Sequence, residues 1–454
     1  MQTVNAMRLF LLVALLCGTV FPFRTPSCQS FVLASSSGNA GGGSALSTST
    51  TSTSLHSSTS PISPNPLLSK IKLSKTIEVF STVKEMEASG LKVTSLCVGE
   101  PDFPPPKAVL DATIAAVNNK DTRYTAVTGT KDLREAVADD LRSRKGLDYD
   151  ATEVLCSNGA KQSVYQGVLA FCGEGDEVII PAPYWPSYPE MVALTGAKPV
   201  IVPTTIEDGF LLEPEKLEEY ITERTKLMIF CNPSNPTGAV HSAERQADIA
   251  SVLRRHPQVV VLSDEIYERL VYNPSNPHVS FASMEGMYNR TLTVNGFSKA
   301  YAMTGMRLGY MAAPAPLLKP CVTIQSQLTS CAGSLSQAAG VAAIRDVEEA
   351  EMEANVVNMR GKRDYVISRL EKIEGLKFFV PDGAFYVLPD FSGWLGGDDT
   401  EFCLKLLKEK KLALVPGSSF GADGTVRISY ATSMEELKVA MDKLEEFCEE
   451  KRER

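Results

Sequence analysis

Short, continuous apolar runs alternate with helical patterns from about residue 71 onward, and this alternation restricts the fold more than any other feature of the sequence. The clearest runs cover residues 178–180, 227–230 and 259–262. Because every position in them is apolar, they predict strands that helices cover on both faces. We therefore predict an α/β fold with a mainly parallel sheet flanked by helices for the middle of the chain.

The pattern changes towards the C-terminus. Residues 341–374 are rich in Ala, Glu, Met and Arg and predict a long helix that ends at Gly375. A run over 376–380, a Pro-Asp-Gly turn at 381–383 and a run over 384–388 then predict a β-hairpin. This combination indicates a second, smaller α+β domain.

The N-terminal 70 residues have the composition of a targeting leader. Arg8 precedes an apolar run over residues 9–17, which is too short to span a bilayer and has the length of a signal-peptide core. Residues 35–63 contain 17 Ser or Thr among 29 residues, and no acidic residue occurs before residue 71, as in organelle transit peptides. An apolar run followed by an acid-free Ser/Thr tract resembles the bipartite leaders that direct proteins to algal plastids through the secretory route, with Phe31 following the first cleavage. Secretion with a Ser-rich linker, or delivery to another organelle, is the alternative.

These patterns divide the chain into five predicted segments. The segments are a signal-peptide-like leader (1–30), a transit-peptide-like stretch without fixed structure (31–70), the N-terminal part of the small domain (71–114), a large domain (115–340) and the C-terminal part of the small domain (341–454).

Composition excludes several classes of function. The formal net charge of −9 argues against a nucleic-acid-binding surface. The ten cysteines form no C-x-x-C pair, and the chain has only four histidines, so we expect neither a disulfide framework nor a metal site. We also expect no stable association with a membrane.

Polar residues follow the predicted strands at the points where the strands end. In a parallel sheet these ends meet along one edge, where ligands bind. Together they would bring an amide, a carboxylate, a phenol, a lysine and an arginine into one crevice, which suits an aromatic, phosphorylated and electrophilic cofactor. The segments concerned are residues 232–238, 264–267 and 298–309.

The order and content of these segments resemble the fold-type I pyridoxal-phosphate aminotransferases of classes I and II. The resemblance covers nearly all of residues 71–454, and the stretch from Ser298-Lys299 to Arg307 is its most specific part. It implies a large cofactor-binding domain, a smaller α+β domain and bound pyridoxal 5′-phosphate. Met306 departs from the pattern, because relatives usually have Trp there.

Within this family the sequence is most similar to the plant and bacterial-type aspartate aminotransferases that also act on prephenate. Residues 99–103, 157–162 and 181–185 carry this similarity. It implies transamination of aspartate or glutamate with 2-oxoglutarate or oxaloacetate, and of prephenate to arogenate. An aspartate-only enzyme, or a broader one that accepts alanine or aromatic amino acids, is the alternative.

The resemblance implies four residues that act on the cofactor's reactive parts. Lys299 attaches the cofactor covalently and later moves a proton at the substrate α-carbon. Asp264 lies at the ring nitrogen and keeps it protonated, because a nearby opposite charge favours the cationic form. Asn235 and Tyr267 donate hydrogen bonds to the phenolate oxygen.

Further residues are implied to hold the phosphate and the ring. Arg307 and the backbone N–H groups of Gly159 and Ala160, at a helix start, bind the phosphate. Trp185 offers an apolar face to the ring. Tyr124 matches a tyrosine that reaches the phosphate of a neighbouring subunit, which implies a homodimer with shared active sites.

The substrate is implied to be held by its carboxylates. Arg427 matches the arginine that binds the α-carboxylate through two parallel hydrogen bonds. Gly99 lets the substrate approach the backbone closely. Lys161 supplies a cation for a second, distal carboxylate, and Thr76 lies on the same side. Trp185 and Asn235 of the cofactor site are also implied to contact the substrate.

Two alternative functions come from other classes of protein. A regulator built on a degenerate cofactor fold would have lost catalytic groups, yet all those named above are present. A nucleotide-binding enzyme is excluded, because the chain lacks both the G-x-G-x-x-G and the G-x-x-x-x-G-K-[ST] motifs.

Overall fold

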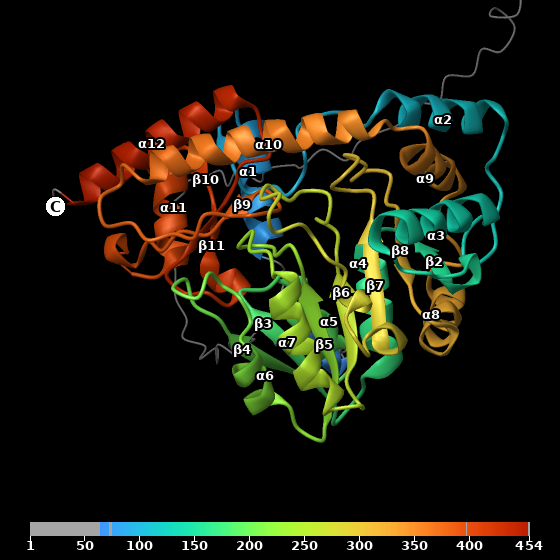
Figure 1. Ribbon diagram of the computed structural model, residues 1–454. Coiled ribbons are helices and arrows are strands. Elements are labelled where there is room, and N and C mark those ends of the chain that lie inside the picture. Colours follow the sequence, from blue (N-terminus) through green and yellow to red (C-terminus); the bar gives the residue numbers. More distant parts are fainter. Residues whose placement is uncertain (1–63, 72–74, 396, 453–454) are drawn as a thin grey trace, which may run out of the picture. The chain divides into compact units, whose positions relative to one another are not determined.

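A seven-stranded sheet lies at the centre of the protein (Figure 1). The computed structural model describes residues 64–71, 75–395 and 397–452, all within one compact unit. The strand order is β2-β8-β7-β6-β5-β3-β4, and β8 is antiparallel to both of its neighbours while the other pairs are parallel. The strands are β2 (Val154–Ser157), β3 (Glu177–Ala182), β4 (Lys198–Pro203), β5 (Thr225–Cys231), β6 (Val260–Asp264), β7 (Thr291–Gly296) and β8 (Gly309–Ala312).

The continuous apolar runs form strands, as predicted, because both faces of the sheet are covered. Along each strand, neighbouring side chains enter different cores: Ile180, Ile229 and Leu262 lie in one, and Ile179, Met228 and Val261 in the other. Each such fully buried side chain stabilises the fold by roughly 1.5–3 kcal/mol.

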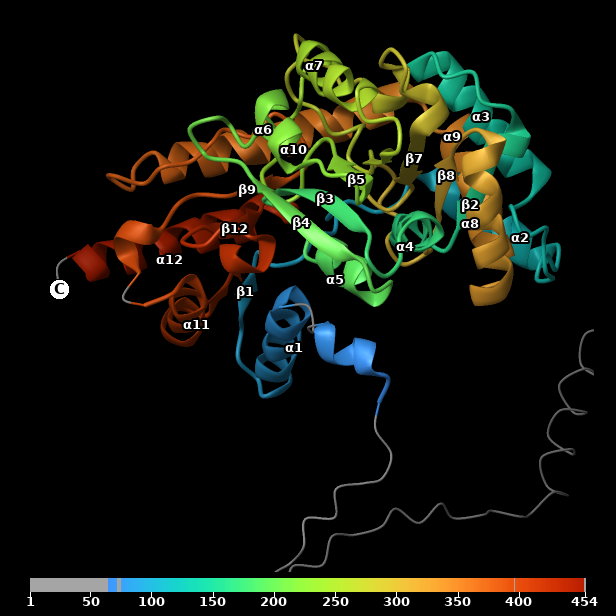
Figure 2. The same cartoon turned by 90° about the horizontal axis from the view of Figure 1, so that it is seen from below.

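Helices form the two outer layers, which Figure 2 shows on either side of the sheet. The core that contains Ile180 includes residues of α4 (Ala160–Phe171), α5 (Ser187–Leu194) and α8 (Ala315–Leu328). The opposite face packs against α6 (Pro214–Tyr220) and α7 (Ala243–Arg254) at one end, and at the other against α2 (Lys107–Asn118), α3 (Lys131–Lys145) and α9 (Ser334–Arg345).

Two small sheets and four further helices complete the described chain. β11 (Val415–Pro416), β12 (Val426–Ser429) and β9 (Tyr386–Val387) form an antiparallel sheet, and β1 (Thr94–Ser95) pairs with β10 (Leu412–Ala413) in parallel. The helices are α1 (Lys75–Ala88), α10 (Glu349–Leu370), α11 (Asp399–Lys410) and α12 (Met434–Arg452). Short 3-10 helices are η1 (Pro66–Lys70), η2 (Ala151–Glu153), η3 (Phe281–Ser283), η4 (Tyr288–Arg290), η5 (Ser392–Trp394) and η6 (Gly417–Phe420).

Two predictions near the C-terminus were wrong. The expected single helix over 341–374 is two helices, since the chain leaves the helical conformation between the end of α9 and the start of α10. The expected hairpin does not form, because the turn docks elsewhere: the N–H groups of Asp382 and Gly383 both donate to the carbonyl of Gly238 (3.0 and 2.9 Å). β9 then pairs with β12 and not with residues 376–380.

None of the helices in the described residues is both long and apolar enough to cross a bilayer. The predicted leader, including Phe31, lies outside the described residues apart from 64–70.

Candidate active site

A cavity of about 370 Å³ opens at the carboxyl ends of β5 and β6 and at the loop after β7. Cys231 and Asp264 end neighbouring strands and are paired in register, so both face the same edge of the sheet. The cavity collects most of the predicted site residues. They are Gly99, Ala160, Lys161, Trp185, Asn235, Asp264, Tyr267, Lys299, Arg307 and Arg427.

Asp264 is a buried carboxylate on the cavity wall. Its Oδ2 accepts a hydrogen bond from the Tyr188 hydroxyl (2.6 Å), and its Oδ1 accepts one from the Ile266 N–H (3.3 Å). Burial raises the pKa of Asp264 to about 6, although these two hydrogen bonds and the charge of Lys299 act in the opposite direction. Above that pH the group carries a negative charge that a cationic ring nitrogen would neutralise.

Lys299 lies three residues beyond the end of β7. Its Nζ donates a hydrogen bond to the carbonyl of Gly99. Burial lowers the pKa of Lys299 to about 8; the charge of Glu100 opposes this shift, and Arg427 and Arg307 add to it. The amine is therefore partly deprotonated near neutral pH, as a nucleophile or proton acceptor must be.

Arg427 is held between two aromatic rings. Its guanidinium lies 4.4 Å from the ring centre of Tyr386 and 4.8 Å from that of Phe420, and the residue is only 3% exposed. It donates to Asn235 Oδ1 (3.1 Å) and to the Cys97 carbonyl (2.7 Å), but it forms no ion pair with a described residue. A buried cation without a counter-ion favours an anionic ligand.

Lys161 is a second cation without a described ion-pair partner. Its Nζ lies 5.1 Å from the ring centre of Trp185, and burial together with the charge of Arg307 lowers its pKa. Besides Lys299 and Arg307, which are predicted to serve the cofactor, the cavity therefore presents two further cations, Lys161 and Arg427, that could meet anionic groups of a substrate.

The start of α4 and Arg307 form a cradle for an anion. Gly159 has φ +89°, and a Cβ on it would lie 2.5 Å from Arg307 Nη2, so the absence of a side chain makes room for the guanidinium. The Gly159 N–H itself donates to the Ser157 carbonyl (2.9 Å), which differs from its expected role as a phosphate donor. In the described chain the N–H groups of Ala160 and Lys161 have no acceptor, as is usual at a helix start.

The chemistry of these groups fits pyridoxal phosphate: the anion cradle, the buried Asp264 carboxylate and Lys299, whose pKa is lowered. The cradle suits its phosphate, Asp264 suits a protonated ring nitrogen, and Lys299 suits attack on its aldehyde.

Two predicted residues are not among those that line the cavity: Gly159 acts through the space that it leaves, and Tyr124 is 90% exposed. Thr76 belongs to α1, and its side chain lies outside the described residues. Met306, the departure from the family pattern, packs against the α3–α9 core.

Sequence reasoning missed several cavity residues. The Tyr386 hydroxyl lies 3.0 Å from that of Tyr267, Thr304 donates to Glu100, and Tyr188 supports Asp264. Only Tyr188 had a usable signal, because it lies one helical turn from Trp185.

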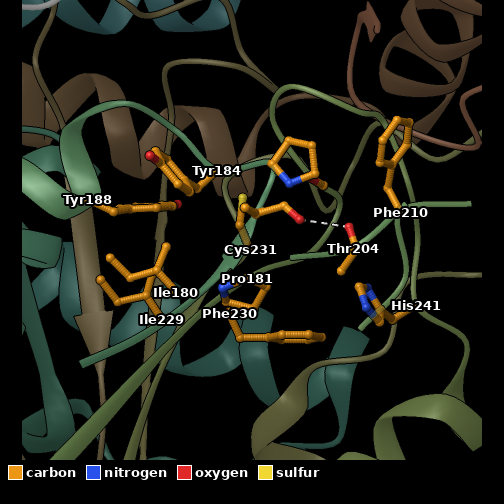
Figure 3. A pocket seen from close by; sticks show the side chains of 13 residues that line it. Ile180, Pro181, Tyr184, Tyr188, Thr204, Phe210, Ile229, Phe230, Cys231 and His241 are labelled. Atoms are coloured by element: carbon orange, nitrogen blue, oxygen red, sulfur yellow. Dashed lines mark hydrogen bonds between the residues drawn. The ribbon is translucent and has the colours of Figure 1, made fainter. Parts of the chain in front are cut away.

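A smaller cavity of about 30 Å³ lies behind Tyr188 and Cys231, which border both spaces (Figure 3). It is large enough for about one water molecule. Burial lowers the pKa of His241 on its wall to about 3, and His241 Nε2 accepts the Leu212 N–H (2.9 Å). This histidine is a neutral structural group and does not serve as a base.

The comparisons with known proteins agree with this site. A family model described as aminotransferase class I and II matches residues 92–444. A Petunia hybrida protein named bifunctional aspartate aminotransferase and glutamate/aspartate-prephenate aminotransferase is 46% identical, over 84% of this chain and 82% of that protein.

Two solved structures extend the comparison to the fold. The aspartate aminotransferase from Rhizobium meliloti is 40% identical, with a TM-score of 0.82 over 86% of this chain and 99% of the other. The aspartate aminotransferase from Thermus thermophilus with maleate is 36% identical, with a TM-score of 0.82 over 85% and 100%. The predicted fold-type I architecture is thereby confirmed, and the chain belongs to the aminotransferase class I and II family.

Proposed function

We propose that this enzyme transfers amino groups between dicarboxylic amino acids and oxo-acids, with aspartate and glutamate as donors, and that it converts prephenate to arogenate. The observation that carries the proposal is the pair of unneutralised cations, Arg427 and Lys161, in the cavity that holds Lys299. One cation serves the carboxylate common to all amino acids. The second, Lys161, lines the cavity from a solvent-exposed position and would bind another carboxylate of a dicarboxylic substrate.

Enzymes of this family use pyridoxal phosphate. Arg307 and the N–H groups at the start of α4 would hold its phosphate, and Asp264 would face its ring nitrogen. When bound, the cofactor supplies an aromatic ring that takes up the electron pair left at the substrate α-carbon. Trp185 would cover one face of the ring, and Asn235 and Tyr267 would donate hydrogen bonds to its phenolate oxygen.

The chain's own groups then handle the substrate and its proton. Arg427 binds the α-carboxylate, and its two flanking rings fix the plane of the guanidinium and exclude water. Lys299 Nζ would move the proton between the substrate α-carbon and the cofactor, a task that its pKa of about 8 suits. Lys161 binds the distal carboxylate.

The names of related proteins support this substrate class. The Petunia hybrida relative is named for aspartate, glutamate and prephenate. The Thermus thermophilus structure contains maleate, which is a dicarboxylate.

The test loads the purified protein with pyridoxal phosphate and adds single amino acids and oxo-acids, followed by absorbance and by mass spectrometry of the products. We expect conversion of aspartate, glutamate and prephenate. An enzyme without activity on prephenate is an aspartate aminotransferase only, and equal activity on alanine or phenylalanine indicates the broader enzyme. In Lys299→Ala, the borohydride-reducible attachment of the cofactor should be lost, and its retention would contradict the role of Lys299.

The enzyme acts as a homodimer in which Tyr124 of each subunit reaches the other subunit's phosphate. Support comes from the exposure of Tyr124 and of Leu110, Ile114 and Val117 (40%, 60% and 51% exposed), which share one face of α2. Apolar side chains at this spacing form a stripe that a second subunit would cover. In sedimentation experiments we expect a dimer that Ile114→Asp weakens; a monomeric wild type would rule out shared sites.

The N-terminal leader directs the enzyme to a plastid through the secretory route. The proposal rests on the apolar run and on the acid-free Ser/Thr tract of residues 1–70. Residues 1–70 fused to a fluorescent reporter should enter the plastid, and Phe31→Ala should block entry after the first cleavage. Export of the reporter from the cell would contradict the plastid assignment.

A further inference from the structure

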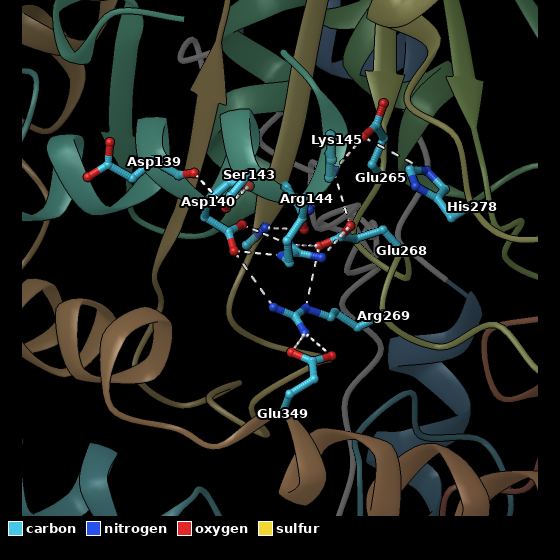
Figure 4. Close-up of polar contacts among 12 residues, drawn as sticks. Asp139, Asp140, Ser143, Arg144, Lys145, Glu265, Glu268, Arg269, His278 and Glu349 are labelled. Carbon is cyan, nitrogen blue, oxygen red and sulfur yellow. Dashed lines mark hydrogen bonds and ion pairs between the residues drawn. The ribbon is translucent and has the colours of Figure 1, made fainter. Parts of the chain in front are cut away.

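A buried cluster of charged side chains lies behind the segment that carries Asp264 and Tyr267 (Figure 4). At its centre, Lys145 Nζ lies 2.7 Å from Glu265 Oε2 and 3.2 Å from Glu268 Oε2. The side chains of these three residues are 4%, 1% and 8% exposed. Lys145 is the last residue of α3, so the cluster ties this helix to the segment after β6.

The second oxygen of Glu265 is also fully engaged. Its Oε1 accepts hydrogen bonds from the hydroxyls of Ser263 (2.9 Å) and Ser280 (2.7 Å) and from the Phe281 N–H (3.3 Å). Burial alone would raise the pKa of Glu265, but the charge of Lys145 and the hydrogen bonds from Lys145 and Ser280 lower it below its ordinary value. Glu265 is therefore a fixed negative charge.

An outer ring of ion pairs surrounds this centre. Arg144 pairs with Asp140 (2.6 Å) and Glu268 (2.8 Å), and Arg269 pairs with Glu349 at the start of α10 (2.7 Å). Figure 4 shows these side chains converging on the same side of the segment as Lys145. They hold Glu268 and the segment's end in place.

Cluster residues and cavity residues come from the same short stretch of chain. Asp264 and Tyr267 border the cavity, whereas Glu265 and Glu268, each next in sequence to one of them, enter the cluster. The charge of Glu265 thus lies one residue from the carboxylate that is to face the ring nitrogen.

We propose that Lys145 is a positioning residue for the cofactor site: by neutralising Glu265 and anchoring Glu268, it keeps Asp264 ionised and fixes the segment that presents Asp264 and Tyr267. The inference rests on the proposed role of Asp264. Without Lys145, Glu265 would keep only its hydrogen bonds and His278, 3.8 Å away, as partners, so the negative charge that it retains would oppose the ionisation of Asp264.

The other groups that face Asp264 are few in the described chain. They are Tyr188 from α5, Cys231 from β5 and Lys299 after β7. On the cluster side, Glu265 faces Lys145, His278, Glu268 and Arg144. Among these groups, Lys145 makes the shortest contact between a cation and Glu265.

The test measures how the affinity of the full-length protein for pyridoxal phosphate depends on pH. Binding is followed by quenching of Trp185 fluorescence in a Trp394→Phe background, where Trp185 is the only tryptophan. Every protein is compared with its own Asp264→Asn counterpart, because the cofactor's phosphate also titrates near pH 6 in both. The difference between the two affinities reports the ionisation of Asp264.

The two single variants should shift this difference in opposite directions. In Lys145→Met, the pH below which the difference in affinity disappears should rise by roughly half a unit to one unit, because Lys145 no longer neutralises the charge of Glu265. In Glu265→Gln it should fall, because the charge of Lys145 remains. The double variant should return towards the wild type.

A purely structural role would weaken binding in both variants without opposite shifts in pH. Arg142→Met is the matched control, since Arg142 lies on the same helix but pairs with Asp139 and Asp148 at the surface; it should shift nothing. Shifts in the same direction, or none, overturn the proposal. If Lys145→Met does not fold, an unshifted or upward result for Glu265→Gln overturns it. If Asp264→Asn leaves the pH dependence unchanged, the role proposed for Asp264 fails first.

Discussion

Tyr188 donates a 2.6 Å hydrogen bond to Oδ2 of Asp264, and both residues are almost fully buried (2% and 4% exposed). Tyr188 comes from α5 and Asp264 ends β6, so the bond connects the helix that follows Trp185 to the sheet edge. A hydrogen bond to the charged form of a carboxylate favours that form. Tyr188 therefore offsets part of the rise in the pKa of Asp264 that burial causes.

Tyr188→Phe should weaken cofactor binding about tenfold, because a hydrogen bond to a charged group contributes about 1.5–3 kcal/mol. The pKa of Asp264 should rise further above about 6, so binding should be lost at a higher pH as the solution is acidified. Fluorescence titration between pH 5 and pH 8 measures both effects. Tyr184→Phe is the control, because Tyr184 and Tyr188 both line the smaller cavity of about 30 Å³. Equal losses in the two variants would show that the hydroxyl of Tyr188 has no special role.

Lys299 should make the stability of the cofactor-free enzyme depend on pH. Its pKa is lowered from 10.5 to about 8. Between these pH values the unfolded chain binds a proton that the folded chain does not, so the free energy of unfolding contributed by this group rises with pH. Compared with Lys299→Met, the wild type should become relatively more stable from pH 8 to pH 10. Denaturant unfolding measures the difference, and Lys408→Met at the surface should show none. A flat difference would mean that the amine is not desolvated.

Gly159→Ala should damage the phosphate cradle. The added Cβ would lie 2.5 Å from Arg307 Nη2, and the alanine would have to adopt the backbone angle of Gly159, φ +89°. With ψ 154°, this conformation belongs to a region that essentially only glycine adopts and costs another residue about 1–3 kcal/mol, and Arg307 must move as well. We expect cofactor affinity to fall at least about tenfold.

Gly173 provides the comparison, because it follows the other end of the same helix and a Cβ there meets nothing within 4 Å. Gly173→Ala should bind pyridoxal phosphate normally. If Gly159→Ala also does, the anion is not held beside Arg307.

The sheet was predictable from sequence because its signal is local. A run such as 227–230 is apolar at every position only when helices cover both faces, and the polar residues after it must then lie at the sheet edge. Asn235, Asp264 and Lys299 were found in this way, and the structure places all three on one cavity.

The features that the sequence did not predict depend on contacts between segments that are far apart along the chain. The turn at 381–383 has a hairpin sequence, but the Gly238 carbonyl accepts its N–H groups, and Gly238 lies more than a hundred residues earlier. Tyr386 lies on β9, and nothing near it in sequence indicates that its ring will support Arg427. The partners of Lys145 likewise come from a segment far along the chain.

Lys161 gives the sharpest test of substrate class. It lies over Trp185 at 5.1 Å and forms no ion pair with a described residue, whereas Arg427 is the residue proposed to bind the α-carboxylate. Lys161→Ala should therefore lower kcat/KM for aspartate and prephenate by about 10- to 100-fold, the value of a hydrogen bond between charged groups. Activity on alanine and phenylalanine should stay nearly unchanged, because these substrates leave Lys161 unpaired in either protein.

Lys107→Ala, which removes an exposed lysine of α2, controls for the loss of a positive charge, and steady-state kinetics with all four substrates measures the contrast. Thr76→Val should weaken prephenate more than aspartate if its hydroxyl meets the larger, ring-borne carboxylate. Equal losses across substrates with one and two carboxylates would remove Lys161 from the specificity site. Arg427 would then be the one substrate-binding cation of the cavity, and nothing in its geometry would select a dicarboxylate.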